Sequence, residues 1–273
     1  MFFQDCLSLF LHYNYTMAYL IIGIVSFLAA GLTLFSGFGL STILMPVLAV
    51  FFPLNIAITL TAIVHFLNNL LKFLLFGKLA DKHVILKFGL PGVIAAFLGA
   101  KLLIKLQHLH PLFSYDLFSH TFQIMPIKLV IAAVIFIFAL LEIIPRFQKL
   151  AFDKKYLVGG GLLSGFFGGL SGHQGALRSA FLIKCGLSKE TFIATGVVIA
   201  CLVDLSRISV YSTGVLSEQL REHTSFVLVA ILSAFAGTLV GNRLIKKVTL
   251  HNVQVIVSIM LFLIAFCLAL GLI

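Results

Sequence analysis

Long apolar runs that carry almost no charge recur along the whole chain. A helix needs about 20 apolar residues to cross the hydrocarbon core of a bilayer. The runs cover residues 18–35, 40–52, 54–76, 84–106, 127–145, 157–170, 174–186, 191–213, 224–245 and 252–273. They predict an all-α, polytopic membrane protein with about 8–10 transmembrane or re-entrant helices.

The composition agrees with a membrane location. Of the 273 residues, 61% are hydrophobic and 10% are charged, whereas charged residues make up about a quarter of a soluble domain. The formal net charge of +10 would suggest nucleic-acid binding in a soluble protein. The basic residues instead follow the membrane topology, so we expect a lipid bilayer as partner and no nucleic acid.

Placing the runs alternately across the bilayer separates the basic residues into two unequal groups. One side holds only Lys105, Lys128 and Arg221, with Lys101 near its edge. The other side receives Lys78, Lys82, Lys87, Arg146, Lys149, Lys154, Lys155, Lys184, Lys189, Lys246 and Lys247. Because basic loops stay in the cytoplasm, the richer side is predicted to be cytoplasmic and both termini to lie outside.

The two halves of the chain match at several polar positions. A shift of 135 residues aligns Ser36-Gly37 with Ser171-Gly172, Asn69 with Asp204, and Lys72 with Arg207. Each half contains five segments, and an odd number inverts the second half relative to the first. We therefore expect two inverted membrane repeats, at residues 18–145 and 157–273, after an N-terminal segment (1–17) and separated by a cytoplasmic basic linker (146–156).

Glycines break the chain at corresponding places in the two halves. The breaks are Ser36-Gly37-Phe38-Gly39 and Ser171-Gly172-His173-Gln174-Gly175. Helices that begin after them, at Leu40 and Ala176, would point their positive ends inward and attract an anion. The runs beside the second break are short, which favours a re-entrant hairpin there. The alternative is close packing of small residues between helices.

Arg178, Lys72, Arg207 and Asp204 are the charged candidates within apolar runs, where an unpaired charge costs several kcal/mol. Arg178 follows the second break and is the strongest candidate for anion binding; its alternative role is an ion pair with Asp204. Lys72 and Arg207 each lie three residues after a polar partner, on one helix face, and their alternative is a position near a helix end with the charge at the interface. Three cations against Asp204 favour an anionic substrate.

A fourth polar cluster could donate hydrogen bonds to an oxyanion or titrate during proton coupling; it contains His65, Asn68 and His173. The alternative is a packing role, which is the commoner one for a lone buried histidine. The candidate substrate-binding residues are Ser36, Gly37, Gly39, His65, Asn69, Lys72, Ser171, Gly172, His173, Gln174, Gly175, Arg178, Asp204 and Arg207. His108, His110, Asp116 and His120 match no metal motif and are expected in a solvated loop at 107–126. We expect no cofactor.

These features together resemble the sulfite exporter TauE/SafE family of bacterial membrane permeases. The matching stretches are residues 31–48, with Met45-Pro46-Val47-Leu48, and 165–182, followed by helices at 95–105 and 237–247 that carry small residues and end in basic ones. The chain departs from the family's usual run of three or four glycines at both breaks. The resemblance implies an anion permease of the bacterial inner membrane that exports sulfite, sulfoacetate or another organic anion.

The sequence therefore predicts a secondary transporter of a small anion, and no enzyme. It contains no Gly-x-x-x-x-Gly-Lys-Ser/Thr loop that would bind a nucleotide. The alternative is a non-transporting membrane subunit or an intramembrane enzyme that uses the same buried polar residues. A cation transporter is disfavoured because Asp204 is the one carboxylate deep in a run, with Glu142 near a helix end. Assembly into a homo-oligomer is left open.

Overall fold

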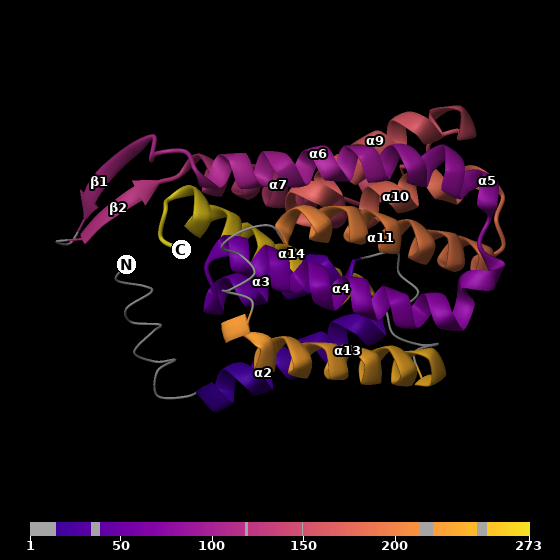
Figure 1. Ribbon diagram of the computed structural model, residues 1–273, viewed down its shortest axis with the longest axis horizontal. Helices are drawn as coiled ribbons and strands as arrows, with labels where there is room; N and C mark the ends of the chain where they lie inside the picture. The colour runs from indigo at the N-terminus through magenta and orange to yellow at the C-terminus, as the bar shows by residue number, and fades with distance from the viewer. Residues whose placement is uncertain (1–14, 34–38, 118–119, 149, 213–220, 245–249) are drawn as a thin grey trace.

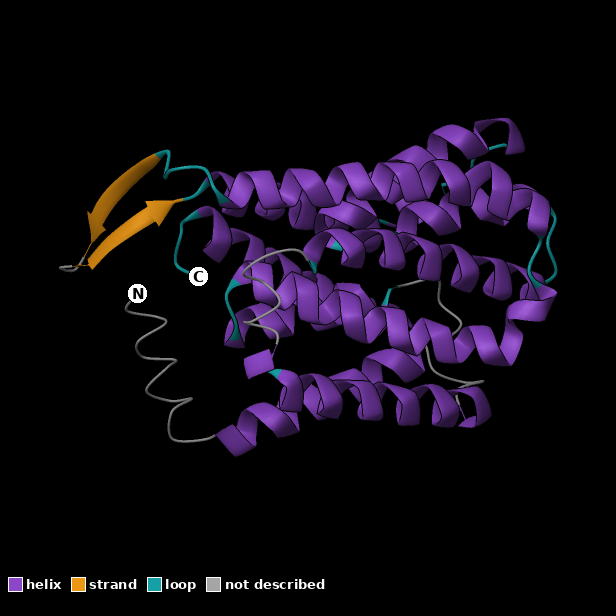
Figure 2. Ribbon diagram, in the orientation of Figure 1, coloured by secondary structure: helices purple, strands orange, loops and turns teal. Residues whose placement is uncertain are grey.

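The computed structural model describes residues 15–33, 39–117, 120–148, 150–212, 221–244 and 250–273. Helices account for nearly all of this part of the chain, and most run along one common direction (Figure 1). The predicted all-α membrane architecture is confirmed. A single two-stranded hairpin projects from one end of the described structure (Figure 2).

Six long helices form the body of the bundle. They are α4 (Leu54–Phe76), α6 (Leu90–Gln107), α7 (Pro126–Ile143), α11 (Lys189–Tyr211), α13 (Thr224–Leu244) and α14 (Leu250–Ala269). Within the described residues, five ranges are long and apolar enough to cross a membrane, namely 54–75, 82–107, 126–143, 189–211 and 224–241. The second of these joins α5 (Lys82–Val84) and the π-helical turn η2 (Ile85–Gly89) to α6.

The second glycine break lies at the tip of a helical hairpin. Helix α9 (Leu157–Ser171) ends at Gly172, whose φ of 85° is left-handed, and α10 (Gly175–Leu182) follows. At 1.5 Å per residue these helices are about 22 and 12 Å long, too short to cross. The Phe152 amide, which precedes α9, donates to the Ala180 carbonyl at 3.0 Å. The hairpin thus returns to the end where it begins. Its short helices agree with the expected re-entrant hairpin, which stays a prediction.

The first half contains a corresponding pair, α2 (Tyr15–Leu32) and α3 (Leu40–Phe51). The Tyr19 ring near the start of α2 stacks on Phe226 with centroids 4.0 Å apart, and Phe52, just after α3, packs its ring edge against the same Phe226. Both ends of this pair therefore lie together. Helix α3 begins at Leu40 as predicted, whereas Ser36 and Gly37 of the first break lie outside the described residues.

The two pairs start from opposite ends of the bundle (Figure 1). Helix α9 packs closely on α6, since a Cβ added at Gly165 would lie 2.1 Å from the Gly92 carbonyl oxygen. Helix α13 packs on α2 in the same manner, since a Cβ added at Gly237 would lie 2.0 Å from the Phe27 carbonyl oxygen. Two helices of the second half thus pack closely on two helices of the first half through small residues.

Short elements connect these helices. The region at 107–126, predicted as a loop, contains strands β1 (Phe113–Leu117) and β2 (His120–Ile124), paired antiparallel. The hairpin rests on the C-terminal segment, where the Tyr115 hydroxyl donates to the Leu270 carbonyl at 2.7 Å. The remaining elements are η1 (Gly77–Leu79), α8 (Pro145–Gln148), η3 (Lys154–Tyr156) and η4 (Ile183–Cys185).

Candidate functional site

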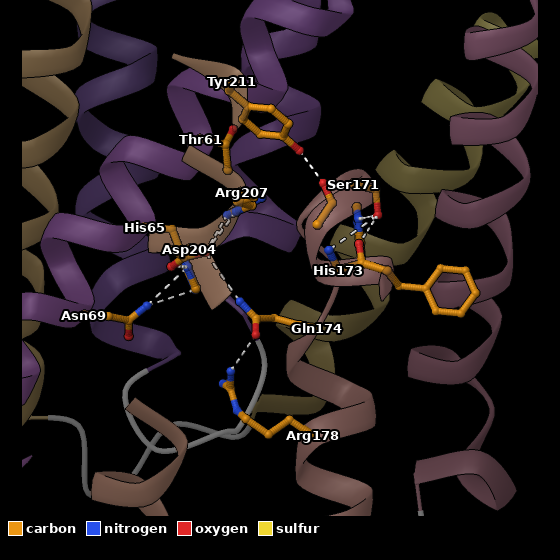
Figure 3. A network of polar contacts seen from close by, with 12 residues as sticks. Thr61, His65, Asn69, Ser171, His173, Gln174, Arg178, Asp204, Arg207 and Tyr211 are labelled. Carbon is orange, nitrogen blue, oxygen red and sulfur yellow. Dashed lines mark hydrogen bonds and ion pairs between the residues drawn. The ribbon is translucent and has the colours of Figure 1, made fainter. Parts of the chain in front are cut away.

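Asp204 is the centre of a buried polar network between α4 and α11 (Figure 3). Its Oδ1 accepts a hydrogen bond from Arg207 Nε at 3.0 Å and forms an ion pair with Arg207 Nη2 at 2.8 Å. Its Oδ2 lies 2.5 Å from His65 Nδ1. Both Asp204 and Arg207 are fully buried. The predicted i, i+3 pair therefore exists, and His65 attaches it to the other half of the chain.

Asn69 extends this network along α4. Its Nδ2 lies 3.2 Å from His65 Nε2, one turn earlier on the same face. Because His65 Nδ1 faces a carboxylate, the Nδ1–H tautomer donates there and leaves Nε2 to accept from Asn69. The sequence-aligned residues Asn69 and Asp204 thus both contact one imidazole.

Arg178 reaches the network only through Gln174. Arg178 Nη1 donates to Gln174 Oε1 at 3.3 Å, and Gln174 Nε2 donates to Asp204 Oδ1 at 3.4 Å. The direct ion pair between Arg178 and Asp204 that the sequence left open is not observed. Asp204 neutralises Arg207, which leaves the positive charge of Arg178 without a directly bonded carboxylate in the described part of the chain.

A cleft of about 60 Å³ opens beside Arg178. It is bordered by both halves of the chain, and its polar lining includes Thr33, His65, Asn69, Lys72, Arg178 and Ser179, together with Gly39 at the start of α3. Lys72 is only 6% exposed, so it does not extend to the interface. Among the described residues, neither a hydrogen bond nor an ion pair is recorded for its ammonium group.

The charge around this network is positive. Lys72, Arg178 and Arg207 oppose the single carboxylate of Asp204, which leaves two positive charges when His65 is neutral. Burial of like charges close together is costly. An anion in the cleft would relieve this cost, and a carboxylate-poor, arginine-containing cleft can bind oxyanions bidentately.

The residues of the second break surround the opposite face of Arg207. A Cβ added at Gly172 would lie 2.7 Å from Arg207 Nη1 and 3.6 Å from Ser41 Cβ. The buried atoms Ser41 Oγ, His173 Nε2 and Arg207 Nη1 have no hydrogen-bond partner in the described structure. Buried polar groups are nearly always paired. The hairpin tip thus meets Arg207 and Ser41 where buried polar atoms lack a hydrogen-bond partner among the described residues.

Ser171 and His173 hold the tip of the α9–α10 hairpin. Ser171 Oγ donates to the Phe167 carbonyl at 3.1 Å and lies 3.2 Å from His173 Nδ1, while the His173 ring packs on Phe138 at 5.5 Å between centroids. The Tyr211 hydroxyl donates to the Gly169 carbonyl one turn earlier. These contacts give Ser171 and His173 a structural role in addition to the predicted one.

The structure separates the predicted residues into three groups. The first group lines the cleft and contains Gly39, His65, Asn69, Lys72 and Arg178. The second group lies behind the cleft and contains Gln174 and Asp204. The third group forms the hairpin tip beside Arg207 and contains Ser171, Gly172, His173 and Gly175. Asn68 belongs to none of them, because its Oδ1 accepts from Thr238 Oγ1 at 2.8 Å in helix packing.

Sequence reasoning missed three residues of this region. Thr33 and Gly196 line the cleft beside Arg178, and Ser41 lies with Arg207 around Gly172. Thr33 and Ser41 lie on either side of the first glycine break, and their position beside it could have indicated that they belong to the site. Gly196 lies in the middle of a long helix, where glycine is unfavourable without a packing reason.

A comparison with protein families gives one match. The profile described as "Sulfite exporter TauE/SafE" matches residues 22–268, nearly the whole chain. No curated protein and no solved structure matches the chain.

Proposed function

The chain belongs to the sulfite exporter TauE/SafE family of membrane transporters, and on that premise we propose that it exports a small anion across the bacterial inner membrane. Sulfite, sulfoacetate and other organosulfonates are the substrates we favour. Transport would proceed by alternating access between the two inverted halves, with the anion held in the cleft beside Arg178 that both halves line.

The cleft between Lys72 and Arg178 is the observation that carries this proposal. Both cations are held inside the protein, beside Gly39 of one half and Gln174 of the other. A sulfonate or sulfite carries several acceptor oxygens on one centre, so it can bind the arginine fork and the ammonium group together. A cation entering the same cleft would instead be repelled.

Gln174 supplies a route for the anion past Asp204. In the structure its amide joins Arg178 to the carboxylate. An anion bound to Arg178 would replace Gln174 Oε1 as acceptor and free the amide. The anion could then reach Arg207 Nη1, Ser41 Oγ and His173 Nε2 on the other side. In this scheme the His65–Asp204 pair carries any coupling proton.

The test is solute uptake by the purified protein in liposomes. Sulfite, sulfate, sulfoacetate, taurine and acetate are compared as tracers or by current, with the Arg178→Ala and Arg178→Lys variants. We expect saturable movement of a preferred anion, loss of movement in Arg178→Ala and partial retention in Arg178→Lys. Lys101→Ala is the matched control, because this exposed lysine packs on the Phe97 ring away from the cleft.

The alternative function is a non-transporting membrane subunit or an intramembrane enzyme. Folded protein that moves none of the five solutes would support it and reject the transporter. Chemical modification of a solute during the assay would identify an enzyme, and equal transport by Arg178→Ala would place the site elsewhere.

A further inference from the structure

A second cavity, of about 270 Å³, lies at the end of the bundle opposite the β hairpin. It forms where α5 and η2 of the first half meet η3 of the linker and η4 of the second half. Its walls are Asp81, His83, Val84, Lys87, Lys154, Lys155, Leu157 and Cys185. We call this cavity the basic pocket. It shares no lining residue with the cleft beside Arg178.

The basic pocket has an excess of positive charge. Lys87, Lys154 and Lys155 oppose Asp81, whose Oδ1 is occupied as the N-cap of α5, where it accepts from the Val84 amide at 2.9 Å. Among the described residues, the ion pair recorded nearby joins Lys184 to Asp153 at the rim and involves none of the three pocket lysines. An anion is therefore the ligand that this pocket favours.

The π-helical turn brings Lys87 to the pocket. Residues Ile85–Gly89 form one widened turn between α5 and α6, a feature that is frequent at functional sites. Phe88, which follows Lys87 in this turn, is buried. Its carbonyl oxygen would lie 2.2 Å from a Cβ added at Gly161 on α9. The turn thus keeps the close packing of α6 on α9 while Lys87 lines the pocket.

Exposed apolar residues lie next to pocket residues along the chain in both halves. Leu86 precedes Lys87, Val158 follows Leu157, and Ile183 lies two residues before Cys185; each is at least half exposed. In a membrane protein such side chains lie against acyl chains. A basic cavity beside lipid-facing apolar residues combines the two surfaces that a phospholipid needs, whereas a free phosphate would use only the lysines.

We propose that the basic pocket binds the phosphate headgroup of an anionic phospholipid, with the acyl chains on the flanking apolar side chains. Basic pockets between transmembrane helices bind anionic headgroups in this manner. The headgroup would contact Lys87 on one side and Lys154 and Lys155 on the other. Lys87 lies in η2, just before α6, and the two other lysines lie just before the α9–α10 hairpin. Lipid binding would therefore join the two halves at this end.

The experiment is native mass spectrometry of the detergent-purified full chain with dioleoylphosphatidylglycerol or dioleoylphosphatidylcholine. The site variant is Lys154→Gln/Lys155→Gln, and the control is Lys101→Gln/Lys105→Gln, two exposed lysines on α6. Each lysine near an anionic headgroup contributes roughly fivefold in affinity. We expect the site variant to lose about 25-fold in phosphatidylglycerol binding and the control to change by less than about twofold.

Thermal unfolding of the same variants separates lipid binding from misfolding. Phosphatidylglycerol should raise the midpoint of the wild type and the control but not of the site variant, while all three unfold alike without lipid. Equal loss in the control, or equal binding of phosphatidylcholine, would overturn the proposal. Millimolar inorganic phosphate that displaces the lipid completely would assign the pocket to a soluble phosphate instead. None of these readouts depends on transport.

Discussion

The imidazole of His65 and the carboxylate of Asp204 lie 2.5 Å apart, although 139 positions separate them in the chain. This contact joins α4 of the first half to α11 of the second. Asn69, which the internal alignment pairs with Asp204, contacts the same imidazole. Asp204 bonds directly to His65 and Arg207, whereas Arg178 is connected to Asp204 only through Gln174.

Asp204→Asn should destabilise the protein strongly. The substitution keeps the shape of the side chain but leaves Arg207 buried without its counter-charge, which costs about 3–5 kcal/mol. The free energy of unfolding in detergent measures this effect. Asp153→Asn is the matched control, because it removes an exposed pair with Lys184 that contributes at most about 1 kcal/mol. Similar losses in both variants would contradict the central role of Asp204.

Lys72→Met should change stability and anion affinity in opposite directions. Methionine has a similar length but removes a buried cation for which no ion pair is recorded in the described structure, so the unfolding midpoint should rise. The same change should weaken anion binding about tenfold or more, since a charge-assisted contact contributes roughly 1.5–3 kcal/mol. Uptake kinetics and thermal unfolding measure the two effects. Lys105→Met, at an exposed position, should change neither.

Gly172→Ala should destabilise the tip of the α9–α10 hairpin. A side chain at φ 85° is strained by about 1–2 kcal/mol, and the added Cβ would lie 2.7 Å from Arg207 Nη1. Both the unfolding midpoint and the transport rate should fall. Gly159→Ala, in the same hairpin, is the control, because a Cβ there meets no atom within 4 Å. Gly159→Ala should leave the unfolding midpoint unchanged or raise it slightly. If it lowers the midpoint as much as Gly172→Ala does, the effect does not come from backbone strain and the Arg207 contact at Gly172.

Alkylation of Cys185 should be slow at neutral pH and accelerate as the pH rises. Burial raises the pKa of this thiol above its ordinary value, so less of the reactive thiolate is present at a given pH. The pH profile of maleimide labelling, in a background with Cys6, Cys201 and Cys267 replaced by serine, measures this. An exposed cysteine introduced at Ser114 provides the reference profile. A midpoint for Cys185 at or below that reference would contradict the burial effect.

Local features of the chain were predictable because they depend on short stretches of sequence. The bilayer requires long apolar helices with internally satisfied backbone groups, so the runs indicate the spans. Gly172 can adopt a left-handed φ without strain, so it indicates the end of α9. Asp204 and Arg207 share a helix face because of the 3.6-residue period. These parts of the prediction needed no knowledge of neighbouring helices.

The sequence by itself determined the membrane class, the second glycine break and the burial of Lys72, Asp204 and Arg207, but not that of Glu142. Only the tertiary structure decided their partners: His65 for Asp204, Gln174 between Asp204 and Arg178, and a buried place for Lys72 in the cleft. Partner choice depends on how each helix is rotated and how closely it approaches the next. Glycines fix the close approach of α9 to α6 and of α13 to α2 in this way, and side-chain periodicity within one helix contains no information about such approaches.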